Sequence, residues 1–424
     1  MRPIEVDEHK RRIEPNLEPG PADLEATGSP DLAKRITLRW LRGNVLDIKA
    51  GSHIGVVNLD CVCIRVRPKL AGSELGVLQM LDYASGVESL RDIGLLQQLG
   101  EGLDLRDLVC LLLNQECDRL LQHGLRRDYL RREEALPVVR GRLLADRQVL
   151  HRFGRLDRLE CRYDERSGDI DDNRLCAAAL WLAARTARAS AVREHARRLA
   201  AQFTAHCGTV GFDARATVER LTYHRANEHY RNAHRWAAML IGHKAFGNLY
   251  TTSGITTPAF MIDMNGLFED FVVRLLRDAV AGTDISVRRQ DTLRSAITKA
   301  DGRAYTRITP DLQLVRGHGP GTWRCSVDAK YKLYTDRRLS TADLYQSFAY
   351  AHALSSSSDT TPPTAYLLYA ADHDRPPETV TLHRRDRAAS ARVTSMPINV
   401  RAILAALAAG DPPPLQIPFH ALGR

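Results

Sequence analysis

The chain has 424 residues, 44% of them hydrophobic, which is enough for two or three domains with cores of their own. Its formal net charge of +9 favours a polyanionic partner such as nucleic acid, and no run of about 18 apolar residues indicates a membrane span. The eight cysteines include no C-x-x-C pair, which argues against a zinc site or a disulfide framework, and the amino terminus lacks the apolar core of a signal peptide. We therefore expect a cytoplasmic protein.

The amino-terminal region alternates between strand and helix patterns. Residues 1–30 are polar, rich in proline and without periodicity, so they predict a flexible tail. From Ile36 to Pro68, short β-branched runs separated by Gly, Asn and Asp predict a small antiparallel sheet. The spacing becomes helical from Leu75 to Gly124, where the glycine is expected to end a helix, and residues 129–144 return to extended structure.

A helix is predicted at the start of the carboxy-terminal half, over Asn265–Leu276. Its apolar residues cover about half of the helical circumference, which is typical of a helix packed on a sheet. Glu269 lies at the border of this apolar stripe and can face the sheet, whereas Asp270 lies opposite and is expected to point to solvent. The alternative for Glu269 is an ordinary solvated side chain.

A β-hairpin is predicted next, between Ile308 and Lys332, where two strand patterns flank the turn sequence RGHGPGT. Pairing the positions on either side of this turn places Asp311 opposite Asp328, with Cβ atoms about 5 Å apart. The period of two puts Lys330 on the same face as Asp328 and the apolar residues on the other face. We therefore expect one charged face and one core face.

This grouping of charges suits metal-dependent hydrolysis. Two adjacent carboxylates repel each other and are stabilised by a shared divalent cation such as Mg²⁺. A neighbouring ammonium can orient an attacking water or stabilise the charge that develops on a phosphate. The pattern thus predicts a Mg²⁺ site on Asp311 and Asp328 with Lys330 beside it. The alternative is an ordinary ion pair between aspartate and lysine on an edge strand.

The order of these motifs resembles a known family. Pro310-Asp311, followed after sixteen residues by Asp328-Ala329-Lys330, resembles the core of the PD-(D/E)XK nuclease superfamily. The flanking sequences NGLFEDFVVRLL, DAKYK and DLYQSFAYA, together with GVVNLDCVCIRVRPKL near the amino terminus, resemble McrC of the McrBC modified-DNA restriction systems. The resemblance implies an α+β protein with a mixed sheet and helical region followed by a restriction-endonuclease-like αβββαβ domain. Its expected domains are a tail of residues 1–30, a region of residues 31–250 that docks on an AAA+ partner, and a nuclease domain of residues 260–424.

The resemblance also implies a catalytic set that extends beyond the hairpin. Glu269 matches the acid that the family carries on its leading helix, and it is expected as a third metal ligand. Gln346 lies one helical turn before Tyr350, which is similar to a Gln–Tyr pair of several nucleases in the superfamily, although packing would explain the spacing as well. The predicted catalytic residues are Asp311, Asp328, Lys330, Glu269 and Gln346, and the predicted metal ligands are Asp311, Asp328 and Glu269.

The expected function is that of a Mg²⁺-dependent endodeoxyribonuclease in a modification-dependent restriction or antiviral defence system. The chain has no Gly-x-x-x-x-Gly-Lys-Ser/Thr loop, so the motor must be another chain. The resemblance implies a GTP-hydrolysing, McrB-like AAA+ ring as partner and modified DNA as substrate, with base recognition left to the motor's own DNA-reading domain. The alternatives are a non-catalytic adaptor that activates such a ring and a stand-alone DNA repair nuclease.

Overall fold

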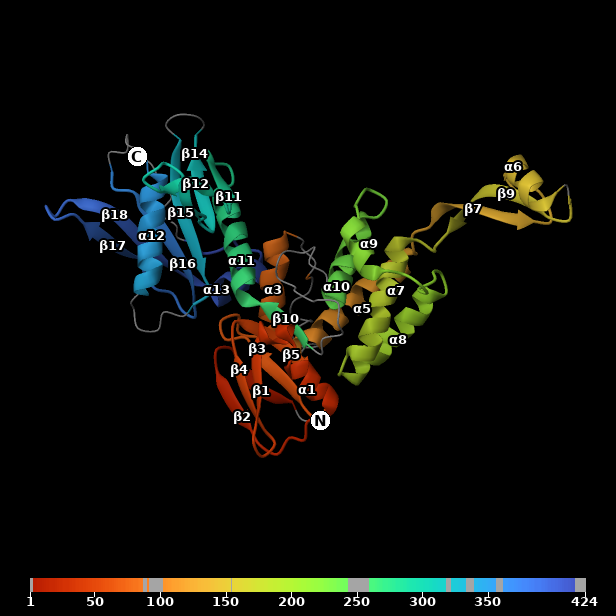
Figure 1. Cartoon of the computed structure of the whole chain (residues 1–424), viewed down its shortest axis with the longest axis horizontal. Coiled ribbons are helices and arrows are strands. Elements are labelled where there is room, and N and C mark those ends of the chain that lie inside the picture. Colours follow the sequence, from red (N-terminus) through yellow and green to blue (C-terminus); the bar gives the residue numbers. More distant parts are fainter. Residues whose placement is uncertain are drawn as a thin grey trace. The chain divides into compact units, whose positions relative to one another are not determined.

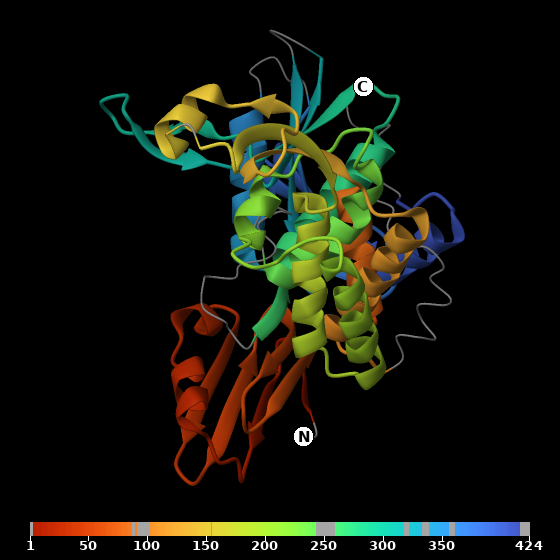
Figure 2. The same cartoon turned by 90° about the vertical axis from the view of Figure 1, so that its right-hand side faces the viewer.

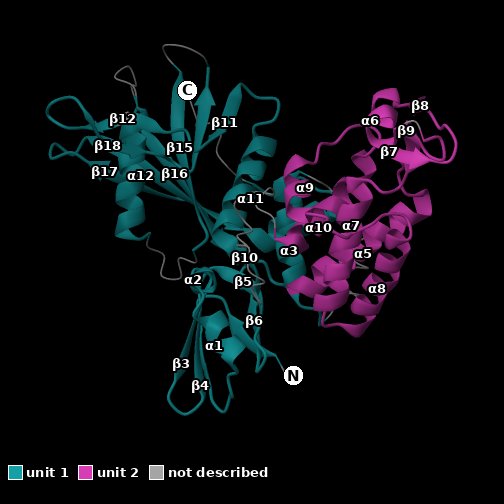
Figure 3. Cartoon of the chain, turned by 45° about the vertical axis from the view of Figure 1, so that its right-hand side comes forward, with its two compact units in different colours: residues 1–104, 253–424 teal, residues 105–252 magenta. Residues whose placement is uncertain are grey.

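The computed structural model describes residues 3–86, 90, 102–153, 155–242, 259–317, 322–332, 339–355 and 361–415 of an α+β protein (Figure 1). Two compact units divide the chain: unit 1 comprises residues 1–104 and 253–424, and unit 2 comprises residues 105–252 (Figure 3). This division differs from the expected domains because strand β10 (Ala259–Asp263) pairs with β5 (His53–Asn58), and helix α11 (Met264–Ala279) packs on α3 (Glu74–Ser85). The first hundred residues therefore belong with the carboxy-terminal half.

Two small sheets of unit 1 are formed largely by the amino-terminal residues. One has the strand order β1-β6-β5-β10, and the other has the order β2-β4-β3. The remaining elements are β1 (Ile4–Asp7), β2 (Arg11–Glu14), α1 (Pro21–Thr27), α2 (Pro30–Ala33), β3 (Ile36–Leu41), β4 (Val45–Ala50) and β6 (Cys63–Arg67). The strands expected between residues 36 and 68 are confirmed and are divided over both sheets. The structure differs from the predicted flexible tail of residues 1–30, because Ile4 and Val6 of β1 are buried where this strand pairs in parallel with β6.

The carboxy-terminal half of unit 1 is built on a six-stranded mixed sheet with the order β11-β14-β15-β16-β18-β17. Its strands are β11 (Ile285–Arg289), β14 (Leu312–Arg316), β15 (Trp323–Lys330), β16 (Thr364–Ala371), β17 (Glu378–His383) and β18 (Ala389–Asn399). Helix α12 (Thr341–Leu354) packs on β15, β16 and β18, whereas α11 packs on β11 and β15, and α13 (Val400–Ala409) contacts α3. The order α11, β11, β14, β15, α12, β16 reproduces the expected succession of helix, three strands, helix and strand.

Helices α11 and α12 cover opposite faces of this sheet. Phe268 of α11 packs against Tyr331, with ring centroids 5.9 Å apart, on the face of the odd-numbered residues of β15. Asp328 is paired with Leu367, and Leu367 belongs with Phe348 of α12 to the apolar core of the other face. The charged face predicted for the hairpin is therefore closed by α12, and Asp328 is only 1% exposed. This corrects the expectation of a core face and a separate charged face, since β15 is a central strand buried on both sides.

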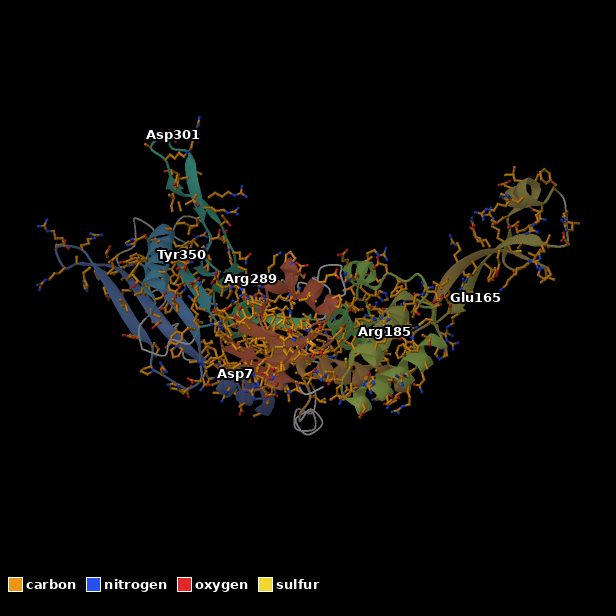
Figure 4. All side chains as sticks on the ribbon, turned by 60° about the horizontal axis from the view of Figure 1, so that its bottom comes forward. Asp7, Glu165, Arg185, Arg289, Asp301 and Tyr350 are labelled. Atoms are coloured by element: carbon orange, nitrogen blue, oxygen red, sulfur yellow. The ribbon has the colours of Figure 1, made fainter. Side chains whose placement is uncertain are left out.

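A separate two-stranded ribbon is inserted between β11 and β14. It consists of β12 (Leu293–Thr298) and β13 (Ala304–Ile308), and Figure 4 labels Asp301 in its turn, where the ribbon projects from unit 1. The sequence patterns predicted no such element. Residues 294 and 296–307 of this ribbon are exposed, so no hydrophobic periodicity marked it.

Unit 2 combines a group of helices with a long β-ribbon (Figure 1 and Figure 2). The helical elements are α5 (Leu105–His123), α7 (Asp171–Thr186), α8 (Ser190–Thr204), α9 (Ala214–Arg220), η1 (Glu228–Tyr230) and α10 (Arg231–Ile241). The ribbon pairs β7 (Asp128–Leu136) with β9 (Leu159–Ser167) and carries β8 (Arg142–Leu143) and α6 (Ala145–Arg152) at its far end. Gly124 ends α5 as predicted, with a φ of +87° that glycine adopts without a Cβ clash. None of the helices that the structure describes has the length and hydropathy of a membrane span.

Candidate active site

The β14–β15 hairpin has the register predicted from the sequence. Arg316 pairs with Trp323, and continuing this antiparallel register places Asp311, which directly precedes β14, beside Asp328. The Nζ atom of Lys330 lies 2.7 Å from Oδ2 of Asp328 and 3.6 Å from Oδ2 of Asp311. The structure thus brings these two aspartates and the lysine together. Residues 318–321 of the predicted turn lie outside the described residues.

Asp328 is the buried member of this group. Apart from the Lys330 ammonium, neither of its carboxylate oxygens has a polar partner that satisfies hydrogen-bond geometry within the described parts of the chain. Burial and the adjacent Asp311 carboxyl raise the pKa of Asp328 to about 7, against the opposing effect of Lys330. A buried carboxylate with so few donors gains stability from any cation that can approach it.

Asp311 and Lys330 are more accessible, with 27% and 20% of their side chains exposed. Oδ2 of Asp311 accepts a hydrogen bond from the backbone N–H of Ala329, at 3.2 Å, which fixes the carboxylate across the two strands. Although burial opposes it, the neighbouring Asp328 and Asp311 carboxylates raise the pKa of Lys330. The lysine is therefore held as an ammonium, which can donate hydrogen bonds but cannot accept a proton.

Glu269 is not gathered with the two aspartates. Its Oε1 accepts a hydrogen bond from Nη2 of Arg289, at 3.2 Å, and Nη1 of the same arginine lies 2.5 Å from Oδ1 of Asp270. Burial and the charge of Asp311 raise the pKa of Glu269, while Arg289 acts in the opposite direction. In the described segments, no three His, Cys, Asp or Glu side chains are arranged as a metal-binding group.

Asp270 does not point freely to solvent as expected. Only 18% of its side chain is exposed, because Arg289 on strand β11 reaches α11 and spans both acidic residues. The helical wheel carries no information about a cation on a neighbouring strand, so it did not predict this pairing of Asp270. Asp270 is consequently coupled to Glu269 through Arg289.

The predicted Gln–Tyr pair forms a hydrogen bond on α12. Nε2 of Gln346 donates to Oη of Tyr350, at 2.6 Å, and Oη of Tyr350 donates to the backbone carbonyl of Thr309, at 3.4 Å. Thr309 precedes Asp311 by two residues, so this contact ties α12 to the segment that carries the first aspartate. Gln346 thereby has a fixed orientation, set by a tyrosine that contacts this segment.

One buried contact near the site was missed by sequence reasoning. Oη of Tyr331, the residue after Lys330, donates to Oε1 of Glu8, at 2.9 Å, and the backbone N–H of Lys69 donates to the same oxygen, at 2.7 Å. Glu8 is 1% exposed, and burial raises its pKa. Glu8 and Tyr331 are 323 positions apart in the sequence, so no local sequence pattern predicts their hydrogen bond. The apolar face expected for Tyr331 was the only available signal that this residue is buried.

The fold and the site define an α+β protein in which a sheet covered by two helices carries an aspartate pair and a lysine on one buried hairpin. The chain belongs to the family of McrBC 5-methylcytosine restriction system components, whose model matches residues 48–370. This match confirms the family resemblance predicted from the motifs.

Two solved structures are similar to this chain. One is a chain of a half-complex from a tetradecameric assembly of Thermococcus gammatolerans McrB AAA+ hexamers with bound McrC, with a TM-score of 0.67, 18% identity, and coverage of 95% of this chain and 96% of that chain. The other belongs to the Thermococcus gammatolerans McrBC complex, with a TM-score of 0.49, 21% identity, and coverage of 68% and 90%. The first likeness supports the α+β fold over nearly the whole length. Comparison with curated proteins gives no match.

Proposed function

We propose that this chain is the McrC-type nuclease subunit of a modification-dependent restriction system and that it cleaves DNA phosphodiesters with Mg²⁺. The observation that carries the proposal is the convergence of Asp311, Asp328 and Lys330 on one buried hairpin. The surrounding order of helix, three strands, helix and strand resembles the PD-(D/E)XK nucleases. The family match supports the assignment to a restriction system, and the absence of a P-loop motif supports a role other than that of the motor.

The donor set fits a hard divalent cation. Asp328 has two buried carboxylate oxygens whose nearest cationic partner is Lys330, and Asp311 adds a second carboxylate beside it. Oxygen ligands of this kind are those that Mg²⁺ prefers. Asp311 and Asp328 would hold the ion, with the backbone carbonyl of Ala329 as a further ligand. When bound, Mg²⁺ lowers the pKa of a coordinated water and screens the negative charge of the phosphate.

Glu269 is the proposed third metal-binding carboxylate, and its present partner is Arg289. Its side chain is 21% exposed, and the Asp311 charge already acts on it, so it lies within electrostatic reach of the aspartate pair. Arg289 holds it at 3.2 Å in the structure. A cation shared with the aspartates would compete with this guanidinium for the carboxylate.

The residues of the chain itself have distinct roles in the proposed reaction. The ammonium of Lys330, held by Asp328 at 2.7 Å, can donate a hydrogen bond to the attacking water or to a non-bridging phosphate oxygen. Because the aspartates raise its pKa, Lys330 orients and stabilises rather than acting as the general base. To Gln346, whose orientation is fixed by its hydrogen bond to Tyr350, we assign the role of positioning the same water or phosphate.

We further propose that unit 2 docks on a GTP-hydrolysing AAA+ partner in the cytoplasm. The far end of the β7–β9 ribbon exposes a group of large apolar side chains, namely Val138, Val139, Val149, Leu150, Phe153 and Leu156. Phe153 is 90% exposed and Leu156 is 75% exposed, and an apolar surface of this kind is typical of a protein interface. The similar fold found with McrB AAA+ hexamers supports such a partner.

Plasmid cleavage with Mg²⁺ and the cognate AAA+ partner tests the nuclease proposal. Asp328→Asn is expected to reduce the cleavage rate at least about 100-fold, since it removes a metal ligand. Glu378→Gln on the edge strand β17 removes an exposed carboxylate elsewhere in the same sheet and is expected to cleave like the wild type. Undiminished cleavage by Asp328→Asn would contradict the site. A wild type that stimulates the partner's GTPase without cutting would favour the non-catalytic adaptor.

A further inference from the structure

The β12–β13 ribbon of unit 1 carries several cationic side chains that pair with no carboxylate among the described residues. Between Leu293 and Ile308 there are four basic residues, Arg294, Lys299, Arg303 and Arg307, and one acidic residue, Asp301. Arg303 lies 3.8 Å from Asp301, whereas the other three cations meet no carboxylate in the portion of the chain that the structure describes. All four are exposed. The ribbon is therefore a projecting surface with a net charge of +3.

The base of the ribbon is attached to the candidate active site. Oγ1 of Thr292, just before β12, lies 3.1 Å from Oγ1 of Thr309, just after β13. The backbone carbonyl of Thr309 also accepts the hydrogen bond from Tyr350 of α12. Only Pro310 separates Thr309 from Asp311. The base of the ribbon is thus joined to the same segment that carries Asp311.

We propose that the β12–β13 ribbon lies in a groove of double-stranded DNA and holds the duplex against Asp311 and Asp328. This inference rests on the proposed nuclease function and assigns the surface that receives its substrate. A two-stranded β-ribbon fits the width of the DNA major groove. The cations of the ribbon contact phosphates on both sides of that groove, where they replace condensed counterions.

The side chains of β13 match this arrangement. Tyr305 and Arg307 alternate along the strand and so share one face, and Tyr305 is 70% exposed although it is a large aromatic residue. Its phenol donates to a phosphate, while Arg307 pairs with a neighbouring phosphate of the DNA backbone. Contacts of this kind position the duplex without selecting a sequence.

A second basic turn of unit 1 provides a matched control. Arg384 and Arg385, between β17 and β18, are exposed and meet no carboxylate among the residues described. In the strand order β11-β14-β15-β16-β18-β17, this turn belongs to the sheet edge farthest from β11. Replacing these two arginines removes the same charge as replacing Arg294 and Arg307. The change lies away from the segment that joins the ribbon to Asp311.

The experiment measures binding of the full-length chain to a labelled DNA duplex of about 30 base pairs, sized to exceed one ribbon footprint of roughly a helical turn. All variants carry Asp328→Asn, so binding is read without cleavage, and affinity is measured across a series of KCl concentrations. Arg294→Ala with Arg307→Ala is expected to weaken binding about 10-fold or more at 0.1 M salt and to flatten the plot of log affinity against log salt by about 1.8, from two lost phosphate contacts. Arg384→Ala with Arg385→Ala is expected to leave both quantities near those of the parent.

The outcomes separate this inference from the function on which it rests. The assignment of the ribbon is overturned if Arg294→Ala with Arg307→Ala leaves the salt slope unchanged. It is also overturned if both double variants lose DNA affinity equally. Either result counts against the ribbon even if the protein with native Asp328 cleaves DNA with Mg²⁺ and its partner. A protein that binds duplex through the ribbon but never cleaves under those conditions overturns the nuclease proposal and keeps the ribbon as a DNA-binding surface.

Discussion

The β7–β9 ribbon of unit 2 and the β12–β13 ribbon of unit 1 both project and are both rich in arginine. On the β7–β9 ribbon most of the arginines lie near acidic partners, at distances of 2.6 to 3.7 Å: Arg131 with Asp164, Arg132 and Arg140 with Glu165, Arg147 and Arg162 with Glu133, Arg152 with Glu160, and Arg155 with Asp157. On the β12–β13 ribbon, Arg303 is the one basic residue with such a partner, Asp301, as far as the described part of the chain extends. Figure 4 labels Glu165 and Asp301, one on each ribbon.

The difference shows that arginine content alone does not predict a nucleic-acid surface. Ion pairs offset most of the charge of the β7–β9 ribbon, where residues 128–167 contain ten arginines and eight acidic residues. The exposed apolar end of this ribbon is its distinctive feature, which suits a protein partner. On the β12–β13 ribbon, Arg294, Lys299 and Arg307 have no carboxylate partner among the residues that the structure places, so the ribbon has a positive field that attracts phosphates. We therefore expect changes in unit 1 to affect cutting and DNA binding, and changes in unit 2 to affect the partner.

The largest effect is expected from Lys330→Ala, which removes the ammonium next to both aspartates. Cleavage should fall at least about 100-fold because a charge that stabilises the transition state is lost. Stimulation of the partner's GTPase should remain at the wild-type level, since unit 2 is unaltered. Equal loss of cleavage and GTPase stimulation would show that the two units do not have separate roles.

The complementary change lies at the end of the β7–β9 ribbon. Phe153→Asp is expected to weaken binding to the AAA+ partner about 30-fold, the effect of losing one aromatic hot spot of about 2 kcal/mol. Binding to partner-free DNA should be unchanged. Tyr129→Asp, at the other end of β7 and 69% exposed, is the matched control, and partner affinity can be measured by biolayer interferometry. Similar losses from both variants would argue against an interface confined to the ribbon end.

A smaller effect is expected within the active site at Glu269. Glu269→Gln should reduce the cleavage rate about 10-fold and raise the Mg²⁺ concentration needed for half-maximal rate, because a candidate ligand is removed. Asp270 is not a suitable control, since Arg289 joins it to Glu269. Glu378→Gln serves instead, and an equal Mg²⁺ requirement in both variants would leave the metal site with two aspartates.

The smallest effect concerns stability without metal. The folded-state pKa of Asp328, about 7, is raised above its ordinary value of 3.8, so the folded protein binds this proton more tightly than the unfolded chain does. The contribution of this proton to the free energy of unfolding is fully present below about pH 4 and is lost as the pH rises through about 7. The Tm in EDTA should therefore decline between pH 5 and pH 8.

Asp328→Asn removes this titration and is expected to raise the Tm at pH 8 by about 2 °C or more. Mg²⁺ should raise the Tm of the wild type at pH 8 but not that of the variant, because the ion binds only the folded carboxylate pair. Thermal scans at the two pH values check both statements, with Glu378→Gln as the control. A wild-type Tm that rises from pH 5 to pH 8 in EDTA would contradict the buried, proton-binding state of Asp328.

The sequence by itself determined the features that depend on neighbouring residues. Strand alternation and the turn between Arg316 and Trp323 fixed the hairpin register, and that register brings Asp311 to Asp328 and Lys330. The spacing of Gln346 and Tyr350 on one helix likewise anticipated their hydrogen bond. In both cases a local period of two or 3.6 residues already places the side chains.

Only the tertiary structure decided which surfaces meet. Burial of Asp328 depends on α12 covering a strand that lies in the middle of the sheet, and the pairing of Glu269 with Arg289 depends on the approach of α11 to β11. Glu8 contacts Tyr331 across 323 positions in the sequence, so a segment that was expected to be a tail supports the end of strand β15. Periodicity tells which face of a helix or strand is apolar, but it does not identify the distant segment that covers that face. In this protein, such distant segments determine how far the side chains of the candidate site are buried and which charges lie beside them.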